Sequence, residues 1–322
     1  MGCTDKDKIC TKASKSSKNV QEKIILQHGK LSAREFLQYF EDKVFKTIKK
    51  YQLIDRKDKV CVAASGGKDS TAALYLTKRY FEKYGLPAEN IFALAINEGI
   101  KLHRNESLKN LKKFCKKEKI ELKIIKVKDE FSTTLDQSAE KFRKLGKKPC
   151  TICGIWRRYL LNKYARKYGA TKLITGHNLD DEAQVILMNQ FKANTSLSAG
   201  LGPISGTQEH HLFVRRVKPL YFCTNQEVIT YTKIKGWELD YCNCIYSQEG
   251  YRSQIKKMLN DFEEKYPGTK HGLVKSFLEV LPLIKEKEIK ERKSTIKICQ
   301  CCGEPANQDI CNACKLKESL EG

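Results

Sequence analysis

Residues Ser65-Gly66-Gly67-Lys68-Asp69-Ser70 form the stretch that decides the fold of this 322-residue chain. The apolar run at 59–64 (KVCVAA) predicts a buried strand before them, and the run at 71–76 (TAALYL) predicts a helix after them. A tight glycine turn between a strand and a helix N-terminus presents backbone N–H groups and a positive dipole end, which together bind phosphate. The Walker loop requires Gly-x-x-x-x-Gly-Lys-Ser/Thr, and this stretch lacks that spacing. The sequence therefore predicts a nucleotide site built on a different phosphate loop.

The charge of the chain indicates a polyanionic partner. It carries 61 Lys and Arg against 38 Asp and Glu, a formal net charge of +23, and the basic residues are spread along the sequence. A charged run is usually a solvated face, but an excess of this size in a folded enzyme favours nucleic acid as the partner. The first residues contain no apolar signal segment, and no stretch approaches the roughly 18 apolar residues of a membrane span. We therefore expect a cytoplasmic protein without a membrane partner.

Three segments are expected along the chain: an N-terminal segment at 1–50, a nucleotide domain at 51–288 and a cysteine-rich tail at 289–322. In the first segment a capping box runs from Ser32 to Glu35, and an amphipathic helix is predicted from four apolar residues at every fourth position: Phe36, Phe40, Val44 and Ile48. In the second segment, strand-like runs alternate with helical patterns; the runs lie at 59–64, 91–97, 121–127 and 172–175. This alternation predicts an α/β fold with a doubly wound parallel sheet covered by helices on both faces.

The tail has the clearest metal-binding pattern. Cys299 and Cys302 form one C-x-x-C pair, and Cys311 and Cys314 form a second. Four thiolates satisfy a tetrahedral Zn²⁺ with no open position, so the pattern predicts a structural zinc ribbon. Cys301 lies between ligands and is interpreted as a bystander. The chain contains 14 cysteines. Disulfides are uncommon in the cytoplasm, so the clustering of these cysteines indicates metal binding rather than loose thiols.

A second group of cysteines lies in the nucleotide domain. Cys150 and Cys153 form a C-x-x-C pair before a basic helical run, and Cys242 and Cys244 follow far downstream. By spacing alone these residues are compatible with a second zinc site, a redox pair or an iron–sulfur site.

Two further stretches follow the loop in order: 147–158 (KKPCTICGIWRR) and 175–184 (TGHNLDDEAQ). Together with SGGKDS they resemble the tRNA 2-thiolation branch of the PP-loop ATP pyrophosphatases, enzymes that cut ATP between the α and β phosphates. The resemblance runs from about residue 35 to the C-terminus and includes the zinc ribbon. It implies that Cys150, Cys153 and Cys244 bind a [4Fe–4S] cluster, with Cys242 as the less favoured third ligand.

The N-terminal segment departs from this family's pattern. Relatives usually open with a zinc finger of two cysteine pairs, whereas this segment offers only Cys3, Cys10 and His28. Two thiolates and one imidazole fall short of a four-ligand site, so the finger is interpreted as degenerate and without metal.

The activity that the resemblance implies is that of a tRNA 2-thiouridine synthetase. The C2 oxygen of uridine is a poor leaving group, and its adenylation by ATP lets a sulfur nucleophile displace AMP. With three cysteines, one iron of the cluster keeps an open coordination position that suits hydrosulfide. A persulfide on Cys150 or Cys244 is the alternative sulfur carrier and needs no iron. The implied partners are tRNA, a sulfur donor (a ubiquitin-like thiocarboxylate protein or sulfide) and a second copy of the chain in a homodimer.

Individual site residues have expected roles. Lys68 adds positive charge at the phosphates, and Asp69 is placed to bind Mg²⁺. Ile96 lies at a strand end where a base binds in a doubly wound sheet. Gly176 permits close backbone approach, Asp181 holds metal or orients the substrate, and Arg157 reaches a phosphate from one helical turn after Cys153. The expected ATP site is Ala64, Ser65, Gly66, Gly67, Lys68, Asp69, Ser70, Ile96, Arg157, Gly176 and Asp181, and the expected catalytic set is Cys150, Cys153, Cys244, Asp181, Arg157 and Lys68.

Two other functions are compatible with parts of the pattern. One is an ATP-dependent ligase or amidotransferase with purely structural cysteines, which the grouping of three cysteines near the loop disfavours. The other is a non-catalytic RNA-binding module, which the complete SGGKDS loop disfavours. The identity of the modified uridine, wobble or T-loop, is left open because RNA shape and surface contacts select it.

Overall fold

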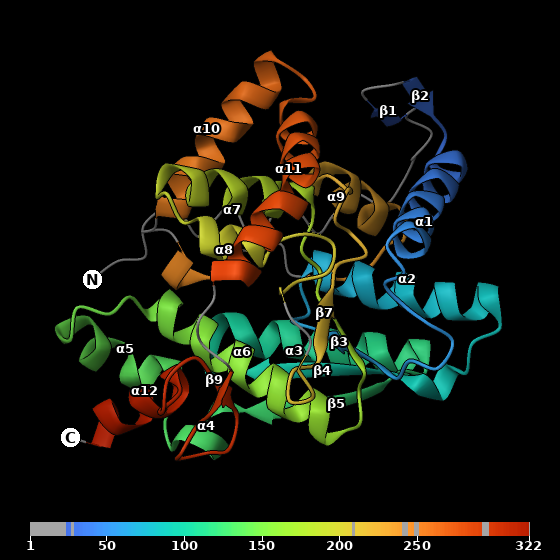
Figure 1. Ribbon diagram of the computed structural model, residues 1–322. Helices are drawn as coiled ribbons and strands as arrows, with labels where there is room; N and C mark the ends of the chain where they lie inside the picture. The colour runs from blue at the N-terminus through green and yellow to red at the C-terminus, as the bar shows by residue number, and fades with distance from the viewer. Residues whose placement is uncertain are drawn as a thin grey trace, which may run out of the picture.

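A five-stranded parallel sheet forms the centre of the protein, in the order β5-β4-β3-β6-β7 (Figure 1). The computed structural model describes residues 24–26, 29–207, 210–239, 244–247, 251–291 and 296–321. The strands are β3 (Val60–Ala63), β4 (Ile91–Asn97), β5 (Glu121–Lys126), β6 (Lys172–Ile174) and β7 (Arg215–Val217). Each neighbouring pair is parallel, so the predicted α/β sheet is confirmed. The sequence analysis missed β7, because its three residues include two arginines and no apolar run.

Helices cover the sheet and extend beyond it. In chain order they are α1 (Ala33–Lys50), α2 (Lys68–Tyr84), α3 (Lys101–Glu118), α4 (Val127–Phe131), α5 (Leu135–Lys144), α6 (Pro149–Lys167), α7 (Leu179–Phe191), α8 (Thr195–Ala199), α9 (Asn225–Ile234), α10 (Tyr251–Lys265), α11 (Thr269–Glu291) and α12 (Asn312–Glu321). None of the described helices is long and apolar enough to cross a membrane. A short antiparallel hairpin, β1 (Ile24–Leu26) with β2 (Gly29–Leu31), precedes α1.

The two faces of the sheet are covered by different helices. Alternate residues of a strand point to opposite faces. Val60 and Val62 pack in one apolar cluster with α1, α2, α3 and α9. Cys61 and Phe92 pack in another, with Ala165 of α6. Both faces of the central strands are therefore buried, as expected for a doubly wound sheet.

Helix α1 forms as the sequence predicts. Ser32 caps it, and the reciprocal hydrogen bonds of a capping box join the Ser32 and Glu35 side chains and backbones. The four apolar residues at every fourth position, Phe36, Phe40, Val44 and Ile48, are all fully buried.

The C-terminal segment packs against α6, the helix that carries Cys150 and Cys153. β8 (Lys297–Ile298) and β9 (Pro305–Ala306) form a small hairpin before α12. Cys299 and Cys311 share an apolar cluster with Ile152 and Trp156 of α6. Figure 1 shows this red segment beside α6, whereas α10 and α11 stand with α7 and α8 at the other end of the molecule.

The topology locates the position where a ligand should bind. From β3 the chain runs outward to β4 and β5 on one side, then returns to β6 and β7 on the other. The order reverses between β3 and β6, and open α/β sheets bind ligands in the crevice at the carboxyl ends of the strands at such a point. The SGGKDS loop follows β3 at this reversal, as predicted.

Candidate active site

The phosphate loop lies between the end of β3 and the start of α2. Its two serines close it, because the Ser65 N–H donates to Ser70 Oγ at 3.0 Å and the two hydroxyl oxygens also lie 3.0 Å apart. Gly67 is the N-cap of α2 and brings no side chain, so the first-turn N–H groups are left for a ligand. Lys68 Nζ lies 2.6 Å from the Asp69 carboxylate. The loop therefore combines an anion-binding helix end with a cation and an oxygen ligand that suits Mg²⁺.

Two glycines allow the backbone of the loop to be packed closely. Gly66 has φ +85°, and a Cβ there would lie 2.3 Å from the carbonyl oxygen of Ser107. A Cβ on Gly176 would lie 2.7 Å from the carbonyl carbon of Asp69 and 2.8 Å from the Ser70 nitrogen. The close approach predicted at Gly176 is thus made to the phosphate loop itself, across the crevice between β3 and β6.

A chain of polar side chains continues from the loop to α10. Asn178 Nδ2 donates to Asp69 at 2.9 Å, and Asn178 caps α7 through a reciprocal pair of hydrogen bonds with Asp181. Arg252 Nη2 in turn donates to Asp181 Oδ1 at 2.8 Å. Asp69 and Asp181, the two carboxylates predicted at the site, are therefore linked through one asparagine. The sequence analysis did not single out Asn178 or Arg252.

A second network, which the sequence analysis also missed, begins at the buried Arg104 of α3. Its guanidinium donates to the Ser65 carbonyl at 2.5 Å and to the Ile96 carbonyl, joining the phosphate loop to the end of β4. Glu98 lies 3.0 Å from Arg104 Nε and 3.4 Å from Arg157 Nε. This buried carboxylate therefore connects the loop to α6. In sequence, Arg104 is one more charge on a basic helix, and nothing marks its partner.

The three cysteines predicted to act together converge at the N-terminus of α6. Cys150 and Cys153 lie in its first turns, and the Cys150 thiol donates to the Tyr246 carbonyl at 2.7 Å, next to Cys244. Arg157 contacts the Cys153 thiol by a side-chain hydrogen bond. Cys242, the alternative third ligand, lies outside the described residues, as do Cys3, Cys10 and His28.

Burial disfavours the thiolate forms of Cys153 and Cys244 when no metal is present. Burial and the nearby Glu98 raise the pKa of Cys153 to about 12, and negative charge on Cys244 or Cys150 adds to the rise. Burial also raises the pKa of Cys244. A cation bound among the three sulfurs would reverse this, because metal coordination deprotonates a thiol.

His177 lies among positive charges. Its Nδ1 is 2.9 Å from Thr175 Oγ1. Part of the side chain reaches solvent, but many protein atoms lie close around it. This enclosure, with the charges of Lys218, Arg252 and Arg157, lowers the pKa of His177 to about 3. The imidazole is therefore neutral at physiological pH.

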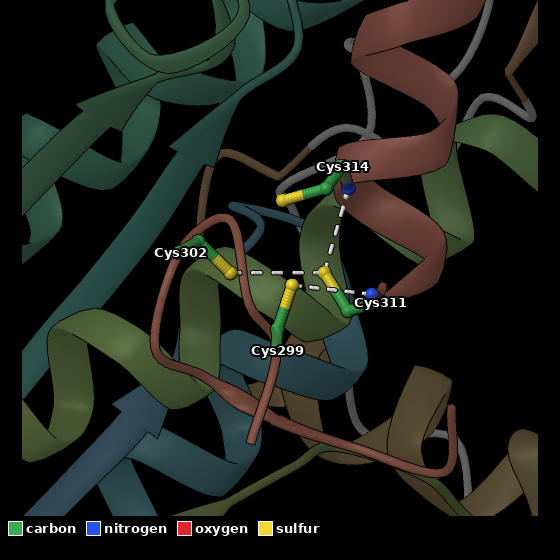
Figure 2. Close-up of side chains that lie close together, drawn as sticks. All are labelled: Cys299, Cys302, Cys311 and Cys314. Carbon is green, nitrogen blue, oxygen red and sulfur yellow. Dashed lines mark hydrogen bonds between the residues drawn. The ribbon is translucent and has the colours of Figure 1, made fainter. Parts of the chain in front are cut away.

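The four cysteines predicted to bind zinc are brought together. Figure 2 shows the thiols of Cys299, Cys302, Cys311 and Cys314 pointing toward one another, and all four sulfurs lie within 4.8 Å of each other. The Cys302 and Cys311 sulfurs are 3.8 Å apart, the separation (~3.8 Å) expected when two Zn–S bonds of about 2.3 Å meet at the tetrahedral angle. Burial opposes ionisation of Cys299, but backbone N–H donors lower its pKa to about 6. Cys301 is exposed and is not part of this set.

In the described part of the chain, no other group of three or more such ligands is as compact. Cys150, Cys153 and Cys244 are therefore spaced more widely than the ligands of a single ion. A cube of four irons is larger than one ion, and its thiolate ligands stand correspondingly farther apart.

Comparison with known proteins places the chain in a family. The sequence matches the PP-loop domain family over residues 36–261. The tRNA-5-methyluridine(54) 2-sulfurtransferase of Pyrococcus horikoshii is 37% identical over 286 residues, which cover 89% of this chain and 87% of that protein. The cytoplasmic tRNA 2-thiolation protein 1 of Caenorhabditis elegans is 36% identical over 287 residues, covering 88% and 74%. The chain belongs to the tRNA 2-thiolation branch of the PP-loop family.

A solved structure of a PP-loop thiolase supports the same assignment. The U34-tRNA thiolase NcsA from Methanococcus maripaludis, solved with its [4Fe-4S] cluster, matches with a TM-score of 0.77 and 29% identity. The match covers 92% of this chain and 93% of NcsA. The family resemblance seen in the three motifs is therefore confirmed over nearly the whole length of the chain.

The contact of Gly176 with the phosphate loop can be tested by adding one methyl group. In Gly176→Ala the new Cβ overlaps the Asp69 and Ser70 backbone, so the loop must shift, and overpacking of this kind costs about 1–3 kcal/mol. We expect ATP affinity to fall at least about tenfold, measured by calorimetry, with a lowered melting temperature.

The matched control is Gly272→Ala in α11, where a Cβ would meet nothing within 4 Å. Alanine favours a helix by roughly 0.5–1 kcal/mol over glycine, so this variant should bind ATP normally and melt at the same temperature or slightly higher. Normal ATP affinity in Gly176→Ala would show that the loop does not depend on this contact.

Proposed function

We propose that this protein is a tRNA 2-thiouridine synthetase: ATP adenylates the C2 oxygen of a uridine, and a sulfur nucleophile then displaces AMP. One observation carries the proposal. Arg157 pairs with Glu98 and contacts Cys153, so a single charged network joins the phosphate loop to the three thiols. Relatives named as a tRNA 2-sulfurtransferase and a 2-thiolation protein support the reaction class.

The residues around the loop suit ATP and Mg²⁺. Lys68 and the first-turn N–H groups of α2 would hold the phosphates, and Asp69 offers oxygen ligands to the cation. Arg104 holds the Ser65 and Ile96 carbonyls in place, so the loop need not reorganise when the nucleotide binds. Arg157, about half exposed (47%), can reach a phosphate while Glu98 orients its guanidinium. Donors held in position in this way stabilise the charge that develops as pyrophosphate leaves.

The three thiols suit a [4Fe–4S] cluster, which would be held by Cys150, Cys153 and Cys244. When bound, such a cluster would supply a Lewis-acidic iron with an open position for sulfide. The persulfide alternative requires a cysteine that is nucleophilic without metal. Burial raises the pKa of Cys244, one of the two cysteines considered as carriers, which disfavours that route at this residue.

The proposal covers tRNA uridines as a class, because one relative is named for position 54 and a matched structure for position 34. The sulfur donor would be sulfide or a ubiquitin-like thiocarboxylate protein.

The four cysteines of the C-terminal segment would bind one structural Zn²⁺, because four thiolates leave it no open coordination position.

The nucleotide products test the first half-reaction. With tRNA and ATP we expect AMP and pyrophosphate, separated by chromatography, since a PP-loop directs cleavage between the α and β phosphates. Lys68→Ala should slow their release about a hundredfold or more, because it removes a charge that stabilises the leaving group. Lys287→Ala, an exposed lysine of α11, is the control and should leave the rate unchanged. ADP and phosphate as products would contradict the proposal.

Iron content tests the three thiols. After anaerobic reconstitution we expect Cys150→Ser, Cys153→Ser and Cys244→Ser each to lower bound iron and the visible absorbance band of the cluster. Cys242→Ser and Cys301→Ser should leave both unchanged. Full tRNA thiolation by iron-free protein supplied with a persulfide donor would refute the cluster and support the persulfide carrier.

Zinc content tests the C-terminal set. We expect one zinc per chain by elemental analysis, lost in Cys299→Ser, Cys302→Ser, Cys311→Ser and Cys314→Ser but kept in Cys301→Ser. Because the zinc-binding segment covers Ile152 and Trp156, its loss should also lower the melting temperature. Freshly purified protein without zinc would refute this assignment.

A further inference from the structure

The positive charges around the active site divide into compensated and uncompensated ones. Lys218 lies 2.7 Å from Glu182, while Arg252 and Arg157 pair with Asp181 and Glu98 as described above. Arg158 and Arg216 differ, since neither has an ion pair with a carboxylate among the described residues.

These two arginines lie side by side. Arg216 Nη2 donates to the Arg158 carbonyl at 3.4 Å, and burial together with the charge of Arg158 lowers the pKa of Arg216 to about 10. Two adjacent cations without an anion between them repel each other, which is unfavourable unless a ligand supplies negative charge. Planar guanidiniums bind phosphate oxygens in a bidentate manner.

Both arginines line a hollow of about 370 Å³ between α6, the segment before β7 and the C-terminal segment. Arg158 lies near enough to Cys153, and Arg216 near enough to His177, for their charges to act on those side chains, so the hollow lies near the proposed active site. Glu304 is its one acidic residue, and its charge is compensated by Arg166 at 2.5 Å. The far wall carries the amide side chains of Asn307, Gln308 and Asn312.

An aromatic ring is held at the edge of this hollow. Phe213 is 43% exposed, although the residues on either side of it are fixed by hydrogen bonds. The buried Asn162 side chain donates to the Leu212 carbonyl at 2.8 Å and accepts from the Val214 N–H at 3.0 Å. One asparagine thus holds the residue on each side of Phe213 and presents the ring to solvent.

We propose that this hollow binds one nucleotide of the tRNA loop that carries the target uridine. Its backbone phosphate lies on Arg158 and Arg216, its base stacks on Phe213, and the amides of the C-terminal segment offer hydrogen bonds to the base edge. Proteins recognise unstacked loop bases by this combination of basic groups, aromatic faces and polar side chains. The inference rests on the proposed function, because it takes tRNA as the substrate.

Binding of unmodified tRNA, measured by fluorescence anisotropy without ATP over a series of salt concentrations, tests the hollow. In Arg158→Gln/Arg216→Gln we expect affinity to fall and the slope of log affinity against log salt to become shallower by roughly 0.7–1, since one phosphate contact is lost. In Phe213→Ala we expect affinity to fall about fivefold to a hundredfold with an unchanged slope, since stacking involves no counterion release.

The controls are Arg79→Gln on α2 and Phe262→Ala on α10, exposed residues of the same types away from the hollow. Both should bind as the wild type does. Arg216→Lys, which keeps the charge but not the fork, should lower affinity and keep the slope, and it serves if the double variant does not fold.

The outcomes separate this inference from the proposed function. Wild-type protein that does not bind tRNA in this titration would refute both. Wild-type binding with unchanged affinity and slope in the hollow variants would refute the hollow alone. Free pyrophosphate can be added as a competitor in the same titration. Variants that bind tRNA normally but lose only the competition by pyrophosphate would show that the hollow binds product rather than RNA, which also overturns the inference.

Discussion

The contact between the Gly176 backbone and the start of α2 is the constraint on which the active site depends. Parallel neighbours β3 and β6 end side by side, so the loops that follow them must share one narrow crevice. Only a residue without a Cβ fits there, since added atoms would lie 2.7 Å from the Asp69 backbone. From the other side Arg104 binds the Ser65 carbonyl, so the phosphate loop is held between two elements before any nucleotide arrives.

The arrangement of charge follows from the same crevice. A basic protein that simply gathered cations at its reacting centre would destabilise that centre by mutual repulsion. Here the innermost cations are paired: Arg157 with Glu98, Lys218 with Glu182 and Arg252 with Asp181. Arg158 and Arg216, which have no carboxylate partner in the described part of the chain, lie farther out, beside the C-terminal segment. A polyanion is thereby attracted to the edge of the site, while the geometry near the thiols stays defined by ion pairs within the protein.

The sequence predicted what depends on local patterns and left out what depends on contacts across the fold. The apolar run of β4, the capping box at Ser32 and the cysteine pair spacing each lie within a few residues, and the sheet and family that they indicate are confirmed. The Glu98 network was missed because its members come from three elements and have no spacing rule. The exposed position of Phe213 was missed for the same reason, since Asn162, which holds the residues on either side of it, lies on α6, 50 residues before Leu212.

Helix α6 connects the C-terminal segment and its four compact cysteines to the proposed active site. Ile152, Trp156 and Leu160 recur every fourth residue, and this buried stripe packs against the C-terminal segment that presents four thiols. Cys153 and Arg157 lie one position further along, about 100° around the helix, on the side that faces Glu98 and Cys244. A rotation of α6 about its axis would therefore disturb both sides together. By filling one side of the helix, the C-terminal segment holds the thiols on the other in register with the phosphate loop.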